Sequence, residues 1–327
     1  MKKVLVTGAS GLLAINIIEE LLNAHFFVFG FLRNPKKFPL KNHQNLELII
    51  GDISQSSTYL EVLKKTDIVI HVAAKTGQNI LQYKEYKHIN VNATKELLTY
   101  SIENNVQKFI YISSANAFGY GDLENLGNET KPIKAPFNTS LYAMSKLEAQ
   151  NAVLELAEKQ EQTKIMVLNP TFLIGKYDTK PSSGRIILSA YKKKIIFYPP
   201  GGKSFINVKD AAQTIVKSIE FGKHKESYIL SGENLSFLEF YKKVNKALHQ
   251  KSSFVRIPKF LLIFVGYLGN ALRFFGLRTD LSLSNLKTLS VSNFYSNRKA
   301  KNELHHQQNK IEEGIEAAIK WFDLDRK

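Results

Sequence analysis

The stretch TGASGLLA, residues 7–14, decides how this chain folds. It follows the apolar run KKVLV and leads into the helically spaced pattern LLAINIIEELLNA, so it connects a strand to a helix. A glycine-rich turn in this place lets the backbone approach a pyrophosphate, and the start of the helix offers free N–H groups and a positive dipole end. The stretch therefore predicts a dinucleotide-binding loop, with a purely structural turn as the alternative.

Three positions of this loop have separate tasks in the expected turn. Gly8 makes the tight turn, and Gly11 lets the phosphate come close to the backbone. A third small residue is needed where the helix packs against the strand. Ala14 stands there instead of glycine, and one extra methyl group is tolerated at that position.

Short apolar runs alternate with helically spaced segments through the first half of the chain. We expect strands in KKVLVTG (2–8), FFVFGFLR (26–33), LELIIGD (46–52), DIVIHVAA (67–74), KFIYISSA (108–115) and KIMVLNP (164–170). This alternation predicts an α/β fold, namely a Rossmann-type doubly wound parallel sheet with helices on both faces.

The second expected strand indicates which dinucleotide binds. A cofactor with a free ribose 2′-hydroxyl is usually held by Asp or Glu near the end of this strand. Here FGFLRNPKK has no acid and carries Arg33, followed by Lys36 and Lys37. A guanidinium suits a 2′-phosphate, so we expect NADP, with NAD as second choice and an exposed basic turn as the alternative.

The third and fourth expected strands end in residues that suit the same cofactor. Asp52 in GDI can accept the adenine amino group while Ile53 stacks on the ring, with a plain turn aspartate as the alternative. Ala73 and Ala74 in HVAA leave room for the cofactor, and His71 is expected to be a satisfied core residue rather than a ligand.

After residue 170 the alternation loosens, and loops rich in Pro, Gly and Lys precede mostly helical segments. We expect 1–170 to form the NAD(P)-binding Rossmann domain, with 205–231 returning to it. We expect 171–204 and 232–327 to form a smaller, mostly helical substrate-binding domain. No low-complexity linker separates them, so the two domains are expected to interleave.

Composition and charge exclude several classes of site. The 327 residues contain no cysteine, which excludes disulfides and thiolate metal sites; we expect no metal, and a solvated turn at HH, 305–306. The net charge of +16 comes from lysines spread along the chain without a nucleic-acid module, so we expect no nucleic-acid partner. YKKK, residues 191–194, is expected to face water, with a substrate phosphate as the alternative.

Two stretches bear on location. The start, MKKVLVTGAS, has no apolar run typical of a signal peptide, so we expect a cytoplasmic protein. The apolar stretch FLLIFVGYLGNALRFFG, residues 260–276, is interrupted by glycine, asparagine and arginine, whereas a membrane span needs about 20 predominantly apolar residues. We expect a helix packed on protein, and a helix lying on a membrane surface stays open as the alternative.

The chemistry points to one helix and one strand end. Tyr142 and Lys146 in YAMSK share one face of an expected helix, and a lysine ammonium there would lower the pKa of the phenol so that it exchanges protons. Lys146 can also hold the nicotinamide ribose. Ser114, at the carboxyl end of the fifth strand, could bind the reacting carbonyl, and we prefer it to Ser113 because it lies further out.

At these residues the chain resembles the extended short-chain dehydrogenase/reductases, also called the NAD-dependent epimerase/dehydratase family. The matching pieces are TGASGLLA, GDI, HVAA, NVNAT, ISSANAFG, YAMSK, LNPTFLIG and SFINVKDAA. The stretches LNPTFLIG, KPSSGRIILSAYKKK and SYILSGENLS look more like the dihydroflavonol-reductase-like branch. The resemblance implies catalytic Ser114, Tyr142 and Lys146, and it places Asn90 where relatives order a proton relay. The cofactor-binding set is then Gly8, Ser10, Gly11, Leu12, Arg33, Asp52, Ile53, Ala73, Ala74, Tyr142, Lys146 and Pro170.

We therefore expect an NADP-dependent oxidoreductase that transfers hydride to a ketone or aldehyde, with Tyr142 as proton donor. The alternatives are a sugar-nucleotide epimerase or dehydratase with bound NAD and a non-catalytic NAD(P)-binding protein. A dehydratase often needs an acid pair, and Asp122 and Glu124 fall in an expected loop away from Ser114. By resemblance, the helices at 80–105 and 141–159 could pair in a homodimer around a small carbonyl-type or sugar-type substrate site.

Overall fold

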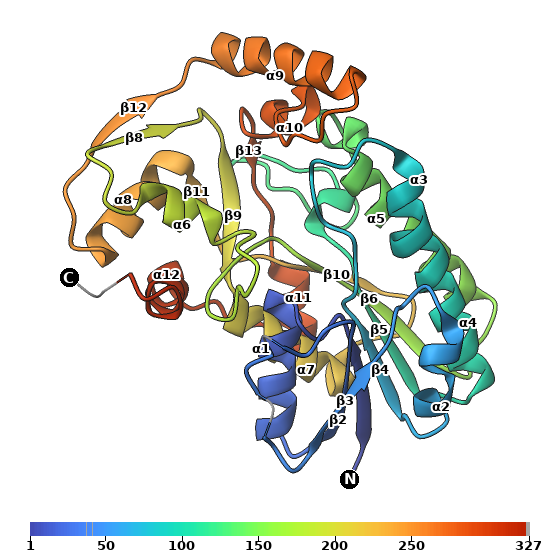
Figure 1. Ribbon diagram of the computed structural model, residues 1–327. Coiled ribbons are helices and arrows are strands. Elements are labelled where there is room, and N and C mark those ends of the chain that lie inside the picture. Colours follow the sequence, from blue (N-terminus) through green and yellow to red (C-terminus); the bar gives the residue numbers. More distant parts are fainter. Residues whose placement is uncertain (37, 41, 325–327) are drawn as a thin grey trace.

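The computed structural model describes residues 1–36, 38–40 and 42–324. It has a larger lobe built on a seven-stranded sheet and a smaller lobe of short strands and helices (Figure 1). Lys37 of the expected cofactor turn lies outside the described residues, so its place is not given.

The large sheet confirms the predicted Rossmann-type doubly wound fold. Its strands are all parallel and follow the order β10-β6-β5-β4-β1-β2-β3. The central strands are apolar and buried because helices cover both faces of the sheet. The strands are β1 (Lys3–Thr7), β2 (Phe27–Leu32), β3 (Leu46–Ile50), β4 (Ile68–His71), β5 (Lys108–Ile112), β6 (Lys164–Pro170) and β10 (Ser227–Leu230).

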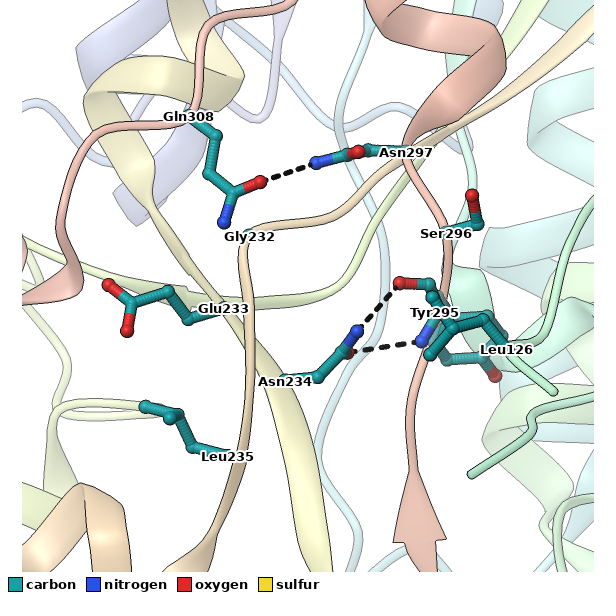
Figure 2. Close-up of a pocket in the computed structure, with 9 residues that line it drawn as sticks. All are labelled: Leu126, Gly232, Glu233, Asn234, Leu235, Tyr295, Ser296, Asn297 and Gln308. Atoms are coloured by element: carbon teal, nitrogen blue, oxygen red, sulfur yellow. Dashed lines mark hydrogen bonds between the residues drawn. The ribbon is translucent and has the colours of Figure 1, made fainter. Parts of the chain in front are cut away.

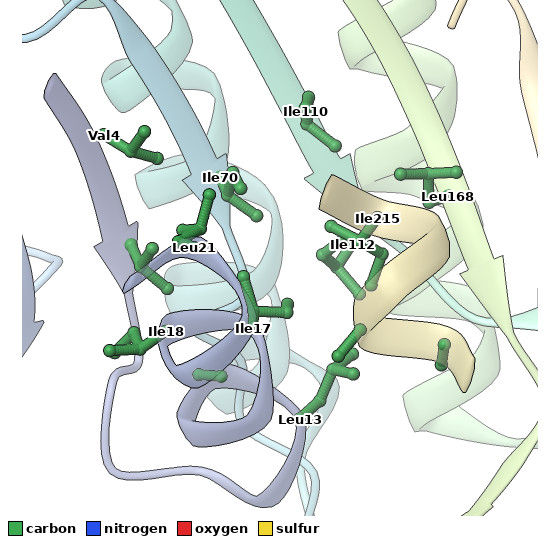
Figure 3. Packing of buried hydrophobic residues seen from close by; sticks show 14 of the residues in the cluster. Val4, Leu13, Ile17, Ile18, Leu21, Ile70, Ile110, Ile112, Leu168 and Ile215 are labelled. Atoms are coloured by element: carbon green, nitrogen blue, oxygen red, sulfur yellow. The ribbon is translucent and has the colours of Figure 1, made fainter. Parts of the chain in front are cut away.

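Two apolar clusters fix the helices to this sheet. One face packs against α1 (Leu12–Asn23), α7 (Val208–Phe221) and α11 (Arg298–Leu304). Figure 3 shows side chains of α1 and α7, among them Ile17 and Ile215, meeting those of the strands. The other face packs against α2 (Leu60–Leu63), α4 (Ala93–Glu103) and α5 (Leu141–Glu158).

The smaller lobe is mostly helical but contains short strands that the sequence did not predict. They are too short for a periodic signal, and several border on glycine or proline. One sheet joins β7 (Phe172–Ile174), β9 (Gly202–Asn207), β11 (Glu233–Ser236) and β13 (Ser292–Asn293), and a second joins β8 (Ile195–Tyr198) and β12 (Ser253–Arg256). The helices are α6 (Arg185–Ala190), α8 (Phe237–Ala247), α9 (Lys259–Phe274), α10 (Leu283–Thr288) and α12 (Ile311–Trp321).

The segment 205–231 is shared between the lobes. Strand β10 extends the large sheet beside β6, and α7 packs on α1 in the larger lobe. Strand β9, however, pairs with β7, β11 and β13 in the smaller lobe. The chain therefore crosses between the lobes several times.

In the C-terminal half, the structure differs from expectation at the histidine pair 305–306 and in how the apolar stretch 260–276 is covered. His306 is not in a solvated turn, because it is 5% exposed and is hydrogen-bonded to Thr214 and Ser231; only His305 is exposed. The apolar stretch at 260–276 forms helix α9, but much of its apolar surface is uncovered. Within the described ranges, no helix combines the length and the apolar character that crossing a membrane requires.

Candidate active site

The carboxyl ends of four neighbouring strands meet where the strand order reverses. Strands β1 and β4 lie side by side, and the chain continues outward from β1 to β2 and from β4 to β5. Thr7 pairs with His71 in register, and His71 pairs with Tyr111. Open α/β sheets bind their ligands outside this switch point. The glycine loop follows β1 directly into it.

The glycine loop has the backbone that its sequence predicts. Gly8 has φ +67°, and a Cβ there would lie 2.8 Å from Ala73 Cα, so only glycine fits without a shift. The Gly11 amide donates to Gly8 O at 2.9 Å and closes the turn. Ala73 is therefore part of the loop wall, and neighbouring Ala74 is half-buried.

Helix α1 begins in a way that fits a phosphate. Its N-cap is Gly11, which supplies no side-chain cap, and its first turn contains no acidic residue that would compete with an anion. Leu12 starts the helix and is half-buried, while Ala14 is fully buried against the sheet. The first N–H groups of α1 and the positive dipole end therefore suit a pyrophosphate. Ser10 is held from the smaller lobe, since Thr179 Oγ1 donates to its carbonyl at 3.2 Å.

Arg33 and Asp52 lie together beside this loop. The Ala9 amide donates to Phe31 O at 3.0 Å, which brings the loop next to the end of β2, and Arg33 is exposed just beyond it. Asp52 Oδ1 accepts from the amide and hydroxyl of Ser54 at 2.9 and 2.7 Å. These bonds, and to a smaller extent the charge of Arg33, lower the pKa of Asp52.

Two other expected cofactor residues are less accessible. Ile53 is 7% exposed and packs in the apolar cluster beneath the sheet, so little of its side chain is left for stacking on adenine. Pro170 is buried at the end of β6, where it pairs in register with Leu230 of β10. Both residues lie next to the strand ends, but their side chains are largely buried.

Ser114 and Tyr142 face each other across the end of β5. Ser114 is the N-cap of the 3₁₀ helix Ala115–Ala117, and it interacts with the Tyr142 side chain, which lowers the pKa of the phenol. Burial acts more strongly in the opposite direction and raises this pKa to about 12. Ser113, the other candidate, has a buried hydroxyl for which the described residues provide no hydrogen-bond partner.

Lys146 lies one turn further along α5 and is 2% exposed. Its Nζ donates to Ile112 O at 2.7 Å and sits 4.4 Å from the centre of the Tyr111 ring. Burial lowers the pKa of Lys146 to about 7. The expectation that Lys146 depresses the pKa of Tyr142 is therefore wrong for this structure, because burial penalises the charged form of both groups.

His71 connects the glycine loop to the helix that follows β4. Thr94 Oγ1 donates to Asn90 O at 2.8 Å, so it accepts from His71 Nε2–H at 2.9 Å. The Thr7 hydroxyl then donates to His71 Nδ1 at 2.7 Å and accepts from the Val72 and Ala73 amides. Burial lowers the pKa of His71 to about 3, which keeps the ring neutral in this tautomer.

Asn90 continues the same network towards Tyr142. Its amide group exchanges hydrogen bonds with the Lys75 backbone, at 2.7 and 3.0 Å, and donates to Ser145 Oγ at 2.9 Å. Ser145 Oγ in turn donates to the Tyr142 carbonyl at 2.7 Å. Asn90 lies in a π-helix, Lys87–Asn92, a geometry found often at functional sites. Asn90 therefore holds the backbone of residue 75 in place. Its hydrogen bonds do not include one with Lys146.

Sequence reasoning missed Ser145 and Thr94 as members of this network. Both are fully buried hydroxyl-bearing residues on helices, and the available sequence signal was their place in the stretches NVNAT and YAMSK. It also missed Lys203 of β9, whose pKa burial lowers to about 8 and whose Nζ lies 5.3 Å from the centre of the Phe172 ring.

Tyr142 opens onto a cavity of about 340 Å³ between the lobes. The other walls come from residues 78–86, the start of α5, and helices α9 and α10. Arg273 and Lys287 are the charged residues among its described lining, which contains no Asp or Glu. Asp122 and Glu124 are exposed elsewhere, and Asp122 Oδ1 accepts from the Glu124 and Asn125 amides.

A second cavity, of about 370 Å³, lies in the smaller lobe away from Tyr142. Figure 2 shows that its polar side chains bind each other: Asn297 pairs with Gln308, and Asn234 pairs with the Tyr295 backbone. Glu233 bonds the Ile311 amide and lies 3.3 Å from Lys243 Nζ. Because these groups already have partners, we place the candidate active site at Tyr142.

Comparison with known proteins gives a family-level match. The NAD dependent epimerase/dehydratase family matches residues 4–231. A "putative dihydroflavonol 4-reductase" of Synechocystis sp. is 24% identical, covering 97% of this chain and 93% of its own. The UDP-glucose 4-epimerase of Vibrio cholerae is 26% identical, covering 79% of each chain.

Solved structures share the whole architecture. The crystal structure of gox2253 is 27% identical, covers 99% of this chain and 98% of its own, and superposes with a TM-score of 0.84. A UDP-glucuronic acid 4-epimerase from Bacillus cereus, solved as a mutant in complex with a fluorinated UDP-glucuronic acid and NAD, is 19% identical. It covers 98% of this chain and 99% of its own, with a TM-score of 0.77.

Proposed function

Because the chain belongs to the NAD dependent epimerase/dehydratase family, we propose that it is an NADP-dependent oxidoreductase that reduces a ketone or aldehyde to an alcohol. Tyr142 donates the proton to the carbonyl oxygen, Ser114 holds that oxygen, and Lys146 restores the proton on Tyr142. The observation that carries this proposal is the position of Tyr142, which faces Ser114, lies one helical turn from Lys146 and opens onto the cavity.

The ionisation of the two groups favours reduction. Tyr142 is protonated at neutral pH because its pKa is about 12, so it enters the reaction as an acid. Lys146, with a pKa of about 7, can carry a proton or release one near neutral pH. As the alkoxide forms, the O–H bond of Tyr142 breaks and its proton moves to the substrate oxygen. Lys146 then returns a proton to the phenolate.

The residues around the glycine loop fit a dinucleotide. Gly8 and Gly11 have no side chains that would keep a phosphate from the backbone, and the uncapped start of α1 suits the pyrophosphate. The small side chains of Ala73 and Ala74 leave space for the cofactor beside the loop. When bound, the cofactor supplies the hydride to the carbonyl carbon. Lys146 would hold the nicotinamide ribose, since its Nζ is fixed at the end of β5.

NADP is our first choice of cofactor because of Arg33. This exposed guanidinium follows the end of β2, beside the glycine loop, and no carboxylate stands in that position for a 2′-hydroxyl. Asp52, the nearest expected acid, is already bonded to Ser54 through one oxygen. It remains available to the adenine amino group through the other.

The residues that line the cavity at Tyr142 bear on the substrate-binding domain and on the type of reaction. We propose that 171–204 and 232–327 form the substrate-binding domain, since α9 and α10 supply one wall of that cavity. A dehydratase is less well supported, because the described lining lacks a carboxylate and the residues after Ser114 are Ala115 and Asn116.

A sugar-nucleotide epimerase with retained NAD is the second candidate. It is favoured by the 26% identity to a UDP-glucose 4-epimerase over most of both chains. Such an enzyme would keep its cofactor through purification and show no net consumption. Arg273 and Lys287 in the cavity lining could then face a substrate phosphate.

The first test is calorimetric titration of cofactor-stripped protein with NADPH and NADH, for the natural chain and Arg33→Ala. We expect a preference for NADPH that falls at least about tenfold in the variant, because a guanidinium–phosphate contact is lost. Arg256→Ala, an exposed arginine on β12, is the matched control and should change neither affinity.

Turnover then separates the candidates. A reductase consumes NADPH with carbonyl substrates, and Tyr142→Phe should lower kcat by about 10²–10⁴-fold while NADPH still binds. A preference for NADH, or NAD that cannot be removed, would overturn the NADP assignment and favour the epimerase. Binding without any turnover over a broad carbonyl screen would favour a non-catalytic protein.

A further inference from the structure

Helix α9 directs its large apolar side chains away from the protein. Its buried side is small: a Cβ at Gly266 would lie 2.8 Å from Leu283 Cα, and one at Gly269 would collide with Leu281 O. Exposed apolar residues recur every three or four positions along the helix and continue past its end. They are Phe260 (73% exposed), Phe264 (59%), Tyr267 (60%), Leu268 (52%), Phe274 (87%) and Phe275 (79%).

Further exposed apolar side chains lie on the two-stranded sheet that precedes α9 in the chain. Phe197 of β8 and Val255 of β12 pair in register and are 61% and 42% exposed, and Ile195 points to the same side as Phe197. Figure 1 shows α9, β12 and β8 along one edge of the molecule, away from the large sheet. We call the outer faces of these three elements the α9 surface. An apolar patch of this extent on a soluble protein marks an interaction site.

Basic side chains border the α9 surface. Lys192, Lys193 and Lys194 are exposed immediately before β8, and the Lys192 amide donates to Gln250, next to exposed Lys251. Arg256 and Lys259 are exposed between β12 and α9. The sequence has no acidic residue between 251 and 279, nor between 191 and 198.

The other two arginines of this region are paired with protein groups. Arg273 donates to the carbonyls of Gln78, Ile80 and Thr279, and the exposed Arg278 lies 3.4 Å from Glu85. Among the described residues of this region, the exposed positive charge that is not paired with a carboxylate is therefore concentrated near β8, β12 and the start of α9. Aromatic residues beside lysines are typical of helices that lie in the headgroup region of a membrane.

We propose that the α9 surface docks on a membrane that contains anionic lipids, with α9 lying in the plane of the interface. Apolar side chains would enter the acyl boundary while Lys192–Lys194, Arg256 and Lys259 meet lipid phosphates. A second copy of this chain fits less well, because a two-fold contact would bring the same basic clusters together. The docking itself goes beyond the proposed reaction and does not depend on it; only the substrate that a docked enzyme would take rests on the proposed function.

The position of α9 gives the docking a consequence for the active site. The helix lies between the α9 surface and the cavity at Tyr142, because Asn270 and Arg273 of the same helix line that cavity. A substrate dissolved in the membrane would therefore have a short path to Tyr142. We expect the docked enzyme to take apolar carbonyl compounds from the lipid phase.

The test is flotation of the full chain with vesicles of phosphatidylcholine alone and of phosphatidylcholine mixed with phosphatidylglycerol. We expect binding to the mixed vesicles that weakens at high salt, since screening removes the electrostatic part. Phe260→Ser/Phe264→Ser/Phe274→Ser should lower binding at least about tenfold, because three insertions are lost. Leu123→Ser, at a 69% exposed leucine that does not belong to the α9 surface, is the matched control and should bind normally.

Several outcomes would overturn the proposal. Absence of vesicle binding, equal binding to both vesicle types, or normal binding of the triple variant would each do so. So would a dimer in light scattering that the triple variant abolishes, without vesicle binding, since the surface would then join two copies. Unchanged NADPH titration in the triple variant shows that it is folded, and it keeps this test separate from that of the reaction.

Discussion

Burial of Lys146 lowers the free energy of unfolding, because its side chain is only 2% exposed. Among the contacts of the described residues, no carboxylate is paired with it. Its pKa is lowered from 10.5 to about 7, a difference that corresponds to about 5 kcal/mol. The catalytic role that we propose for Lys146 would account for a residue that lowers stability in this way. We predict that Lys146→Met abolishes turnover and yet raises the free energy of unfolding at pH 7 by about 1–3 kcal/mol.

The pH dependence has a definite sign. Between pH 7 and 10.5 the unfolded chain holds a proton on Lys146 that the folded chain has lost, so the natural protein becomes more stable as pH rises. The advantage of Lys146→Met should therefore shrink from pH 7 to pH 10 in urea unfolding. Lys65→Met, at an exposed lysine, serves as the control and should show no such trend. A variant less stable than the natural protein at pH 7 would contradict the argument.

His71, unlike Lys146, stabilises the fold at neutral pH, because its hydrogen-bond network satisfies both ring nitrogens in the neutral form. Its pKa is lowered from 6.5 to about 3, so its stabilising effect is complete above pH 6.5 and is lost as pH falls towards 3. At pH 5 the loss amounts to about 2 kcal/mol. We predict that His71→Phe costs about 2–3 kcal/mol at pH 7, because Thr7 and Thr94 lose partners, and that this cost nearly vanishes at pH 5.

The measurement is urea unfolding of both proteins at the two pH values. His43→Phe, at an exposed histidine, is the control and should follow the natural protein throughout. If the difference between the natural protein and His71→Phe were equal at pH 7 and pH 5, His71 would not be the group that titrates.

At the scale of elements, the strand-loop-helix unit of β1 and α1 depends on Gly8. Its φ of +67° costs an alanine about 1–2 kcal/mol, and contact with Ala73 adds a steric penalty. Gly276 has φ +85° but no atom within 4 Å of an added Cβ, so it separates the two effects. We predict that Gly8→Ala lowers the midpoint of thermal unfolding more than Gly276→Ala and weakens NADPH binding at least about tenfold, because the loop moves.

Thermal unfolding and NADPH titration of both variants check this prediction. Gly276→Ala should lose only the conformational part and bind NADPH normally. Equal losses in the two variants would mean that the contact with Ala73 relaxes at little cost.

The elements also show what the sequence could and could not predict. The strands of the large sheet were predictable because each is a short apolar run after a turn, and the loop at Gly8 because its spacing is fixed by backbone geometry. The exposure of α9 was not predictable, because an apolar helix has the same period whether its partner is present or missing. Nor was the pKa of Lys146, which depends on residues of β5 more than thirty positions away.

At the scale of the whole molecule, the core of the larger lobe reaches into the smaller lobe, which also has an apolar cluster of its own. The apolar cluster on the α1 face includes Val4 of β1 and Ile215 of α7, and it continues to Ile206 of β9 and Leu304 of α11. Thr179 from the smaller lobe bonds Ser10 in the glycine loop. Lobes joined in this way should not unfold separately, although chains of this length often do so.

We therefore predict one transition in differential scanning calorimetry, with a calorimetric enthalpy equal to the van't Hoff enthalpy. NADPH at 100 times its Kd should stabilise the folded state by about 2.7 kcal/mol and move the whole transition upward by a few degrees. If the lobes were independent, NADPH would move one transition and leave another in place. The apolar contacts between the lobes would then not couple them, and elements of the smaller lobe such as α9 could open while the glycine loop stays folded. A single transition that moves as one would mean instead that binding at the glycine loop also stabilises the cavity wall around Tyr142.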